Sequence, residues 1–214
     1  PVLPVLSEPA ALDQPASIVF AVDKSGSMGE GSGGVDRLSL AQRAVLETAR
    51  TLAARDSAGL VVFDVEPRVL LPIAPAGEAT EMLAGSWPVQ ARGGTRLAPA
   101  IELAAEQLEG IDARRRILVI VTDGFVEDVP LEALRRRLAD ARIEVVALAI
   151  GPDADADALA RLTSPETGVV LRVNAATCEL LGYERQDLLG RDVMELHPPK
   201  DHEAAAAAMA RTRR

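Results

Sequence analysis

The sequence predicts an α/β fold in which a doubly wound, mainly parallel sheet carries helices on both faces. Short apolar runs such as residues 17–22 and 116–121 have the pattern of strands buried on both sides. They alternate with segments such as residues 38–52, where apolar residues recur at helical spacing. This alternation implies right-handed crossovers and a parallel sheet. In such folds, ligands bind beyond the carboxyl ends of the strands.

The expected elements follow one another along most of the chain. Residues 1–16, rich in Pro and Ala, are expected to form an extended lead-in. Pro67 and Pro72 place the third strand at an edge of the sheet. The strands are expected at 17–22, 59–63, 68–73, 116–121, 143–150 and 168–173. The helices are expected from Asp36 to about Leu52, at 78–85, from Thr95 to about Glu109, at 131–141 and at 155–162.

Composition excludes several classes of function. Hydrophobic residues make up 48% of the 214 positions, enough for a sizeable core. The formal net charge of −9 argues against a nucleic-acid partner, because phosphate binding needs clustered Lys and Arg. A single cysteine, Cys178, excludes an internal disulfide, and no apolar run approaches the ~20 residues that span a bilayer. The chain begins at Pro1 without Met, so we expect an excised fragment, with the cytoplasm as its compartment.

Hydroxyl and carboxylate side chains follow the ends of expected strands. Asp23 and Asp123 end the two most apolar runs, and Asp23 opens the pattern D-x-S-x-S with Ser25 and Ser27. Thr95 stands in a Gly-Gly-Thr turn between the two aspartates, where a threonine is also a common helix N-cap. These donors are all hard oxygens, which favour Mg²⁺, Mn²⁺ or Ca²⁺ over zinc or copper. The sequence therefore predicts a divalent-metal site at the carboxyl end of the sheet.

These motifs carry a family resemblance. Residues 17–173 resemble the von Willebrand factor A (integrin I-like) domain, a Rossmann-like fold, and D-x-S-x-S with a downstream Thr and Asp resembles its metal-ion-dependent adhesion site. The resemblance implies that Ser25 and Ser27 ligate the metal directly, that Thr95 does so directly or through water, and that Asp23 and Asp123 act mainly through water. It also implies a protein-binding module rather than an enzyme. An acidic residue of a partner protein would fill the open coordination position.

Other interpretations of the same residues remain open. A metal-dependent phosphatase would use Asp23 as its nucleophile, and a structural scaffold would carry a vestigial site. Residues 29–34 satisfy G-x-G-x-x-G, but six residues separate them from the strand, so a flexible loop is preferred to a dinucleotide site. Lys24 is expected to be a solvated side chain or a surface cation that helps to capture an acidic partner.

The C-terminal residues have a different character. Val173–Ala176, L-L-G-Y at 180–183, L-L-G-R at 188–191 and His197-Pro198 resemble the N-terminal half of a PAS sensor domain. Residues 168–173 could serve either domain and are assigned to the first, whose sheet is otherwise one strand short. Residues 174–214 are expected to be a mostly helical extension without a cofactor. A real PAS relationship would place the chain in a bacterial signalling or sensor protein.

Overall fold

The computed structural model describes residues 15–32, 35–85, 87–123, 131–150, 159, 162–163 and 170–172. The chain divides into two compact units, Pro1–Arg172 and Val173–Arg214. All the described residues belong to the first unit. Residues 1–14 of the lead-in expected at 1–16, the greater part of the helix expected at 155–162 and the extension expected at 174–214 lie outside the described residues; Ala16 already belongs to the first strand.

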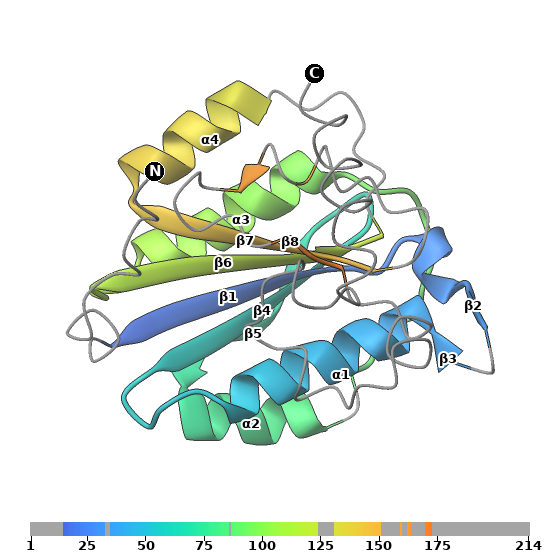
Figure 1. The fold of residues 1–214 in the computed structure, drawn as a ribbon, viewed down its shortest axis with the longest axis horizontal. Helices are drawn as coiled ribbons and strands as arrows, with labels where there is room; N and C mark the ends of the chain where they lie inside the picture. Colours follow the sequence, from blue (N-terminus) through green and yellow to red (C-terminus); the bar gives the residue numbers. More distant parts are fainter. Residues whose placement is uncertain are drawn as a thin grey trace, which may run out of the picture. The chain divides into compact units, whose positions relative to one another are not determined.

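A six-stranded sheet forms the centre of this unit, as predicted (Figure 1). Its strand order is β5-β4-β1-β6-β7-β8, and every neighbouring pair is parallel except β4 with β5. The antiparallel strand β5 lies at the edge, as its prolines predict. The strand bounds are β1 Ala16–Asp23, β4 Ser57–Phe63, β5 Arg68–Pro75, β6 Arg115–Thr122, β7 Ile143–Ala149 and β8 Val170–Arg172.

Helices cover both faces of the sheet (Figure 1). Helices α1 (Arg37–Arg50) and α2 (Ala76–Ala84) lie on one face, and α3 (Leu97–Glu109) and α4 (Leu131–Asp140) lie on the other. Alternate side chains of β1 enter two separate hydrophobic clusters: Phe20 and Val22 pack with α1 and α2, whereas Val19 and Ala21 pack with α3 and α4. Burial on both faces explains why β1 is a continuous apolar run.

The segment predicted as a flexible loop before the first helix contains short regular elements where the structure describes it. A 3₁₀ turn, η2 (Gly26–Gly29), is followed by a short antiparallel pair, β2 (Gly31–Ser32) and β3 (Val35–Asp36). A Cβ atom on Gly31 would come within 2.0 Å of the Val35 carbonyl oxygen, so only glycine fits this close strand approach. The glycine-rich sequence indicated backbone freedom but could not show where two strands would meet.

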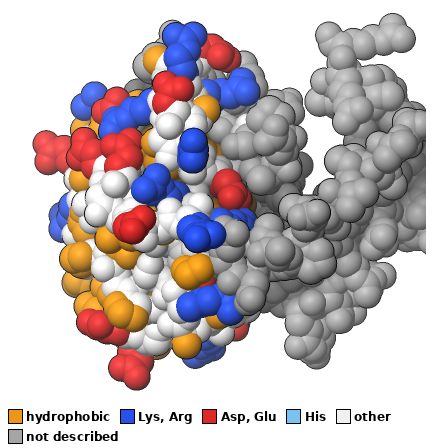
Figure 2. Space-filling model, turned by 90° about the vertical axis from the view of Figure 1, so that its left-hand side faces the viewer, with side chains coloured by type: hydrophobic (Ala, Val, Ile, Leu, Met, Phe, Trp, Pro, Cys, Tyr) orange, Lys and Arg blue, Asp and Glu red, His pale blue; other side chains and the backbone are white. Residues whose placement is uncertain are grey.

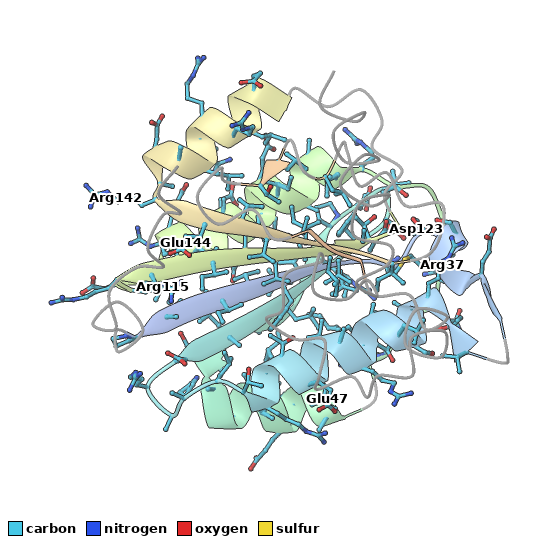
Figure 3. All side chains as sticks on the ribbon, in the orientation of Figure 1. Arg37, Glu47, Arg115, Asp123, Arg142 and Glu144 are labelled. Carbon is cyan, nitrogen blue, oxygen red and sulfur yellow. The ribbon has the colours of Figure 1, made fainter. Side chains whose placement is uncertain are left out.

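The two ends of the sheet differ in character. At the amino ends of the parallel strands, Arg115 pairs with Glu144 at 2.9 Å. Figure 2 shows this end of the molecule, where basic and acidic side chains are interspersed. The carboxyl ends of β1 and β6 meet at the opposite end, where Asp23 ends β1 and Asp123 follows β6 (Figure 3).

Candidate metal centre

Asp23 ends β1 in a fully buried position, 0% exposed. Its Oδ1 accepts a hydrogen bond from the Ser25 backbone N–H at 2.7 Å, which turns the chain immediately after the strand. Its Oδ2 accepts one from the Thr122 hydroxyl at 2.6 Å, at the end of the neighbouring strand β6. Both oxygens therefore have donors, and Asp23 ties the first turn of the motif to the adjacent strand.

The two motif serines lie side by side. The Oγ atoms of Ser25 and Ser27 are 3.1 Å apart, and Ser25 is buried whereas Ser27 is half-buried. The turn η2 holds them in place, because Met28 in the same turn is fully buried among the side chains near α1. Two hydroxyl oxygens thus lie next to one another in the turn that follows Asp23.

Asp123 completes this group from the end of β6. Its Oδ2 accepts a 2.9 Å hydrogen bond from Nη1 of Arg37, the first residue of α1 (Figure 3). The same Nη1 lies 3.4 Å from the Ser27 carbonyl oxygen, so one guanidinium contacts both the D-x-S-x-S turn and the end of β6. The other carboxylate oxygen of Asp123, Oδ1, is buried and has no hydrogen-bond partner among the described residues.

The loop that carries Thr95 approaches the same turn. Gly26 donates its backbone N–H to the Gly93 carbonyl oxygen at 2.9 Å, and Gly93 has a φ of +80°, which favours glycine. Thr95 is half-buried, and within the described part of the chain its hydroxyl makes no hydrogen bond. The helix N-cap is Arg96 rather than Thr95, so the capping role considered for Thr95 is wrong. Its hydroxyl is left available for another partner.

Burial makes the Asp23 carboxylate costly to charge. Desolvation raises the pKa of Asp23; the hydrogen bonds from Thr122 and Ser25 oppose this rise, and the negative charge of Asp123 adds to it. Without a cation, the folded chain therefore prefers a protonated Asp23 more than the unfolded chain does. A bound cation would reverse this preference.

This shift predicts a pH-dependent effect of Asp23→Asn in the presence of a chelator. Stability that comes from the protonated carboxyl is fully present below about pH 4 and is lost as pH rises through the raised pKa. Asparagine carries no charge at any pH, so the free energy of unfolding of the variant should improve relative to the wild type between pH 4 and 7. Urea unfolding in EDTA measures this, with Asp112→Asn at an exposed position as the control. A difference in the free energy of unfolding between Asp23→Asn and the wild type that is the same at every pH contradicts the prediction.

The donor set fits a hard divalent cation. Within the described ranges no three His, Cys, Asp or Glu side chains cluster as a metal site, so a cation here would depend on two carboxylates together with hydroxyls. Mg²⁺ and Ca²⁺ accept such oxygen donors and keep water ligands. The buried Oδ1 of Asp123 has unused acceptor capacity that a cation or its bound water would satisfy.

Three functional residues were missed or misjudged from the sequence. Lys24 is buried, 5% exposed, and its ammonium contacts Asp64, so the prediction of a solvent-facing lysine is wrong. Partial burial tends to raise the pKa of Asp64, but the hydrogen bond and charge of Lys24, together with backbone N–H donors, outweigh it and the pKa is lowered. Arg37 and Thr122 belong to no recognisable motif. The register of β1 with β6 brings Thr122 to the site, and the start of α1 brings Arg37 there.

Comparisons with known proteins identify the family of this fold. The sequence model of the von Willebrand factor type A domain matches residues 18–125, just over half of the chain, and the PAS fold model matches residues 156–214. A comparison with the curated proteins found no match. Among the described residues, no helix combines the length and apolar character needed to cross a membrane.

Solved structures agree with this result. An aerotolerance-related membrane protein from Bacteroides fragilis is 26% identical, with a TM-score of 0.55 over 63% of this chain and 67% of that chain. BatB from Bacteroides thetaiotaomicron is 25% identical, with a TM-score of 0.56 over 64% and 67%. A von Willebrand factor type A protein from Catenulispora acidiphila, 19% identical, shares the fold with a TM-score of 0.63 over 75% and 39%. The chain therefore belongs to the von Willebrand factor type A domain family.

Proposed function

We propose that this domain binds a partner protein through a divalent metal ion held by Asp23, Ser25, Ser27, Thr95 and Asp123. Domains of this family generally act as protein-interaction modules. Mg²⁺ is the proposed ion, with Mn²⁺ or Ca²⁺ as substitutes, because the donors are all hard oxygens. An acidic residue of the partner would supply the last ligand.

The observation that carries this proposal is the buried, unsatisfied Oδ1 of Asp123. A buried carboxylate oxygen without a donor is costly, and folded proteins keep few of them. It lies next to a turn that presents two adjacent hydroxyls, 3.1 Å apart. A cation coordinated here would give the Asp123 Oδ1 atom a partner and remove the cost of its burial.

Each residue has a distinct role in this proposal. Ser25 and Ser27 supply neutral hydroxyl ligands, which leave the charge of the ion largely unneutralised. Asp23 holds the turn by accepting a hydrogen bond from the Ser25 backbone N–H, and its carboxylate contributes negative charge to the site. The bound ion, when present, attracts one further anionic ligand, and the partner's carboxylate is the proposed one.

The geometry argues against the phosphatase alternative. A nucleophilic aspartate needs a carboxylate oxygen that can reach a phosphorus atom in the open site. Asp23 is 0% exposed, and both of its oxygens accept hydrogen bonds, from Ser25 and Thr122. Its arrangement suits the positioning of a loop rather than attack on a substrate.

The PAS match suggests the setting of this module. The PAS fold model begins at residue 156 and runs to the last residue of the chain. We place the domain in a bacterial sensor or signalling protein, where metal-dependent binding of a partner would accompany a sensory unit. The proposed compartment is the cytoplasm.

The proposal is tested with Mn²⁺ as the ion and acetate as the simplest carboxylate. Because Mn²⁺ is paramagnetic, acetate bound to it should show a strongly broadened methyl resonance in the presence of the full chain. EDTA should remove the effect. Thr95→Val, which keeps the side-chain shape but removes the hydroxyl, should weaken Mn²⁺ binding about tenfold or more.

Two results would contradict the proposal. One is acetate broadening that the protein does not enhance over free Mn²⁺ at equal concentration. The other is steady turnover of p-nitrophenyl phosphate that Asp23→Asn abolishes, which would favour the enzyme instead.

A further inference from the structure

A pocket of about 390 Å³ lies beside the D-x-S-x-S turn. Three basic side chains, Lys24, Arg68 and Arg92, line it together with residues 87–90. Among the described residues that line this pocket there is no Asp or Glu, although the chain as a whole carries a net charge of −9. The pocket is therefore a local concentration of positive charge on an acidic protein.

Two of these three cations have no anionic partner in the part of the chain that the structure describes. Lys24 contacts Asp64 and is largely neutralised by it. Arg68 and Arg92 are exposed, and among the residues that the structure describes neither makes an ion pair or a side-chain hydrogen bond. Arginine side chains that line one pocket offer planar guanidinium donors, which suit a carboxylate.

Backbone hydrogen bonds connect the pocket to the candidate metal site. The Arg92 N–H donates to the Lys24 carbonyl oxygen at 2.8 Å, and Lys24 itself lies between Asp23 and Ser25 of the motif. Arg68 pairs in register with Val62 near the end of β4, which places it at the same end of the sheet as Asp23. A peptide lying across this end of the sheet would meet both places.

We propose that this pocket binds a second carboxylate of the partner segment whose first carboxylate completes the metal site. The inference rests on the proposed function and deepens it: the partner presents an acidic segment with at least two neighbouring Asp or Glu residues. In an extended segment, side chains two positions apart point to the same side, about 6.6 Å from one another, so two acidic residues at such a spacing can occupy adjacent sites. The wall formed by residues 87–90 includes Trp87, whose indole N–H donates to the Leu83 carbonyl oxygen at 3.2 Å and fixes this side of the pocket.

The pocket confers selectivity as well as affinity. A single carboxylate would bind the metal alone, whereas a segment with two would also contact Arg68 and Arg92. A nucleic acid would bring many more phosphates against a protein with a net charge of −9, so a short acidic peptide fits this surface better.

The test compares two capped peptides on the full 214-residue chain in Mg²⁺: hexaglutamate, and a peptide of equal length with one glutamate among alanines. The double variant Arg68→Gln, Arg92→Gln should weaken hexaglutamate binding about tenfold and leave the single-glutamate peptide unchanged. Mg²⁺ affinity should also stay the same. Arg43→Gln is the control, because Arg43 is equally exposed but lies on α1, away from the pocket.

Three results separate this inference from the proposed function. Equal hexaglutamate affinity in the wild type and the double variant overturns the proposal that this pocket binds a carboxylate. If both peptides lose binding in EDTA while the double variant binds normally, the metal-dependent function stands without the pocket. Hexaglutamate binding that needs both arginines but persists in EDTA supports an acidic-peptide pocket and contradicts the metal-dependent function.

Discussion

Replacing both Ser25 and Ser27 with alanine should weaken Mn²⁺ affinity more than 100-fold and leave the domain folded. The two hydroxyls are each other's hydrogen-bond partners, 3.1 Å apart, so removing both leaves no buried hydroxyl unpaired. The Asp23 carboxylate keeps its bond to the backbone N–H of residue 25, which alanine retains. The expected loss of affinity is large because both proposed direct ligands are removed. Replacing even a residue that only supports a ligand lowers metal affinity by about 10- to 100-fold.

Titration calorimetry and thermal unfolding measure this effect independently. The wild type should gain about 2.7 kcal/mol of stability at an ion concentration of 100 times Kd, and the double variant should gain none. Ser17 and Ser57 provide a matched control, because their hydroxyls form a similar pair, 2.7 Å apart, where β1 and β4 begin. The Ser17→Ala, Ser57→Ala protein should bind Mn²⁺ normally. One-site binding with unchanged Kd in the Ser25, Ser27 double variant would refute the proposed ligand set.

Arg37→Met should destabilise the metal-free domain by about 3 kcal/mol, the cost of leaving one member of a buried ion pair alone. The side chains of Arg37 and Asp123 are 13% and 5% exposed, so solvent screens their pair weakly. Methionine keeps much of the apolar stem, so the change mainly removes charge. A further ion pair of Arg37, 3.6 Å to the exposed Glu30, is of the kind that contributes little to stability.

The same substitution should strengthen Mn²⁺ binding about tenfold. Arg37 is a cation beside the proposed site, and its removal frees the Asp123 carboxylate and removes a like charge; a tenfold change corresponds to about 1.4 kcal/mol. Urea unfolding in EDTA and titration calorimetry check the two effects. Arg43→Met, at an exposed position of the same helix, is the control for a lost arginine. Weaker Mn²⁺ binding in Arg37→Met would mean that Arg37 helps to build the site rather than competing with the ion.

Much of the fold was predictable, because it depends on local pattern. Continuous apolar runs marked the strands, and the observed strand β1, Ala16–Asp23, differs from the predicted 17–22 by a residue at each end. Asp36 was recognisable at the start of α1, and its carboxylate accepts the Ser39 backbone N–H at 2.6 Å as an N-cap. The positions of Asp23 and Asp123 followed from their place at strand ends, since parallel strands bring those ends to one edge.

The charge partners within the site were not predictable. Lys24 contacts Asp64, and Arg37 contacts Asp123 across 86 positions of sequence, and no motif announces either pair. Such contacts depend on strand register and on the direction in which a helix enters the site, and neither is a local property. The role of Thr95 as a cap was misjudged because the helix begins two residues later, at Leu97.

The position of Trp87 has an optical consequence. It is the one tryptophan among the 214 residues, so the indole emission of the protein has a single source. Its ring is 8% exposed and forms part of the wall that faces Arg68 and Arg92. Indole emission responds to nearby charge and to water, so its wavelength and intensity register the electrostatic environment of that wall. The chain therefore carries an intrinsic fluorophore at the place where we expect an acidic partner to bind.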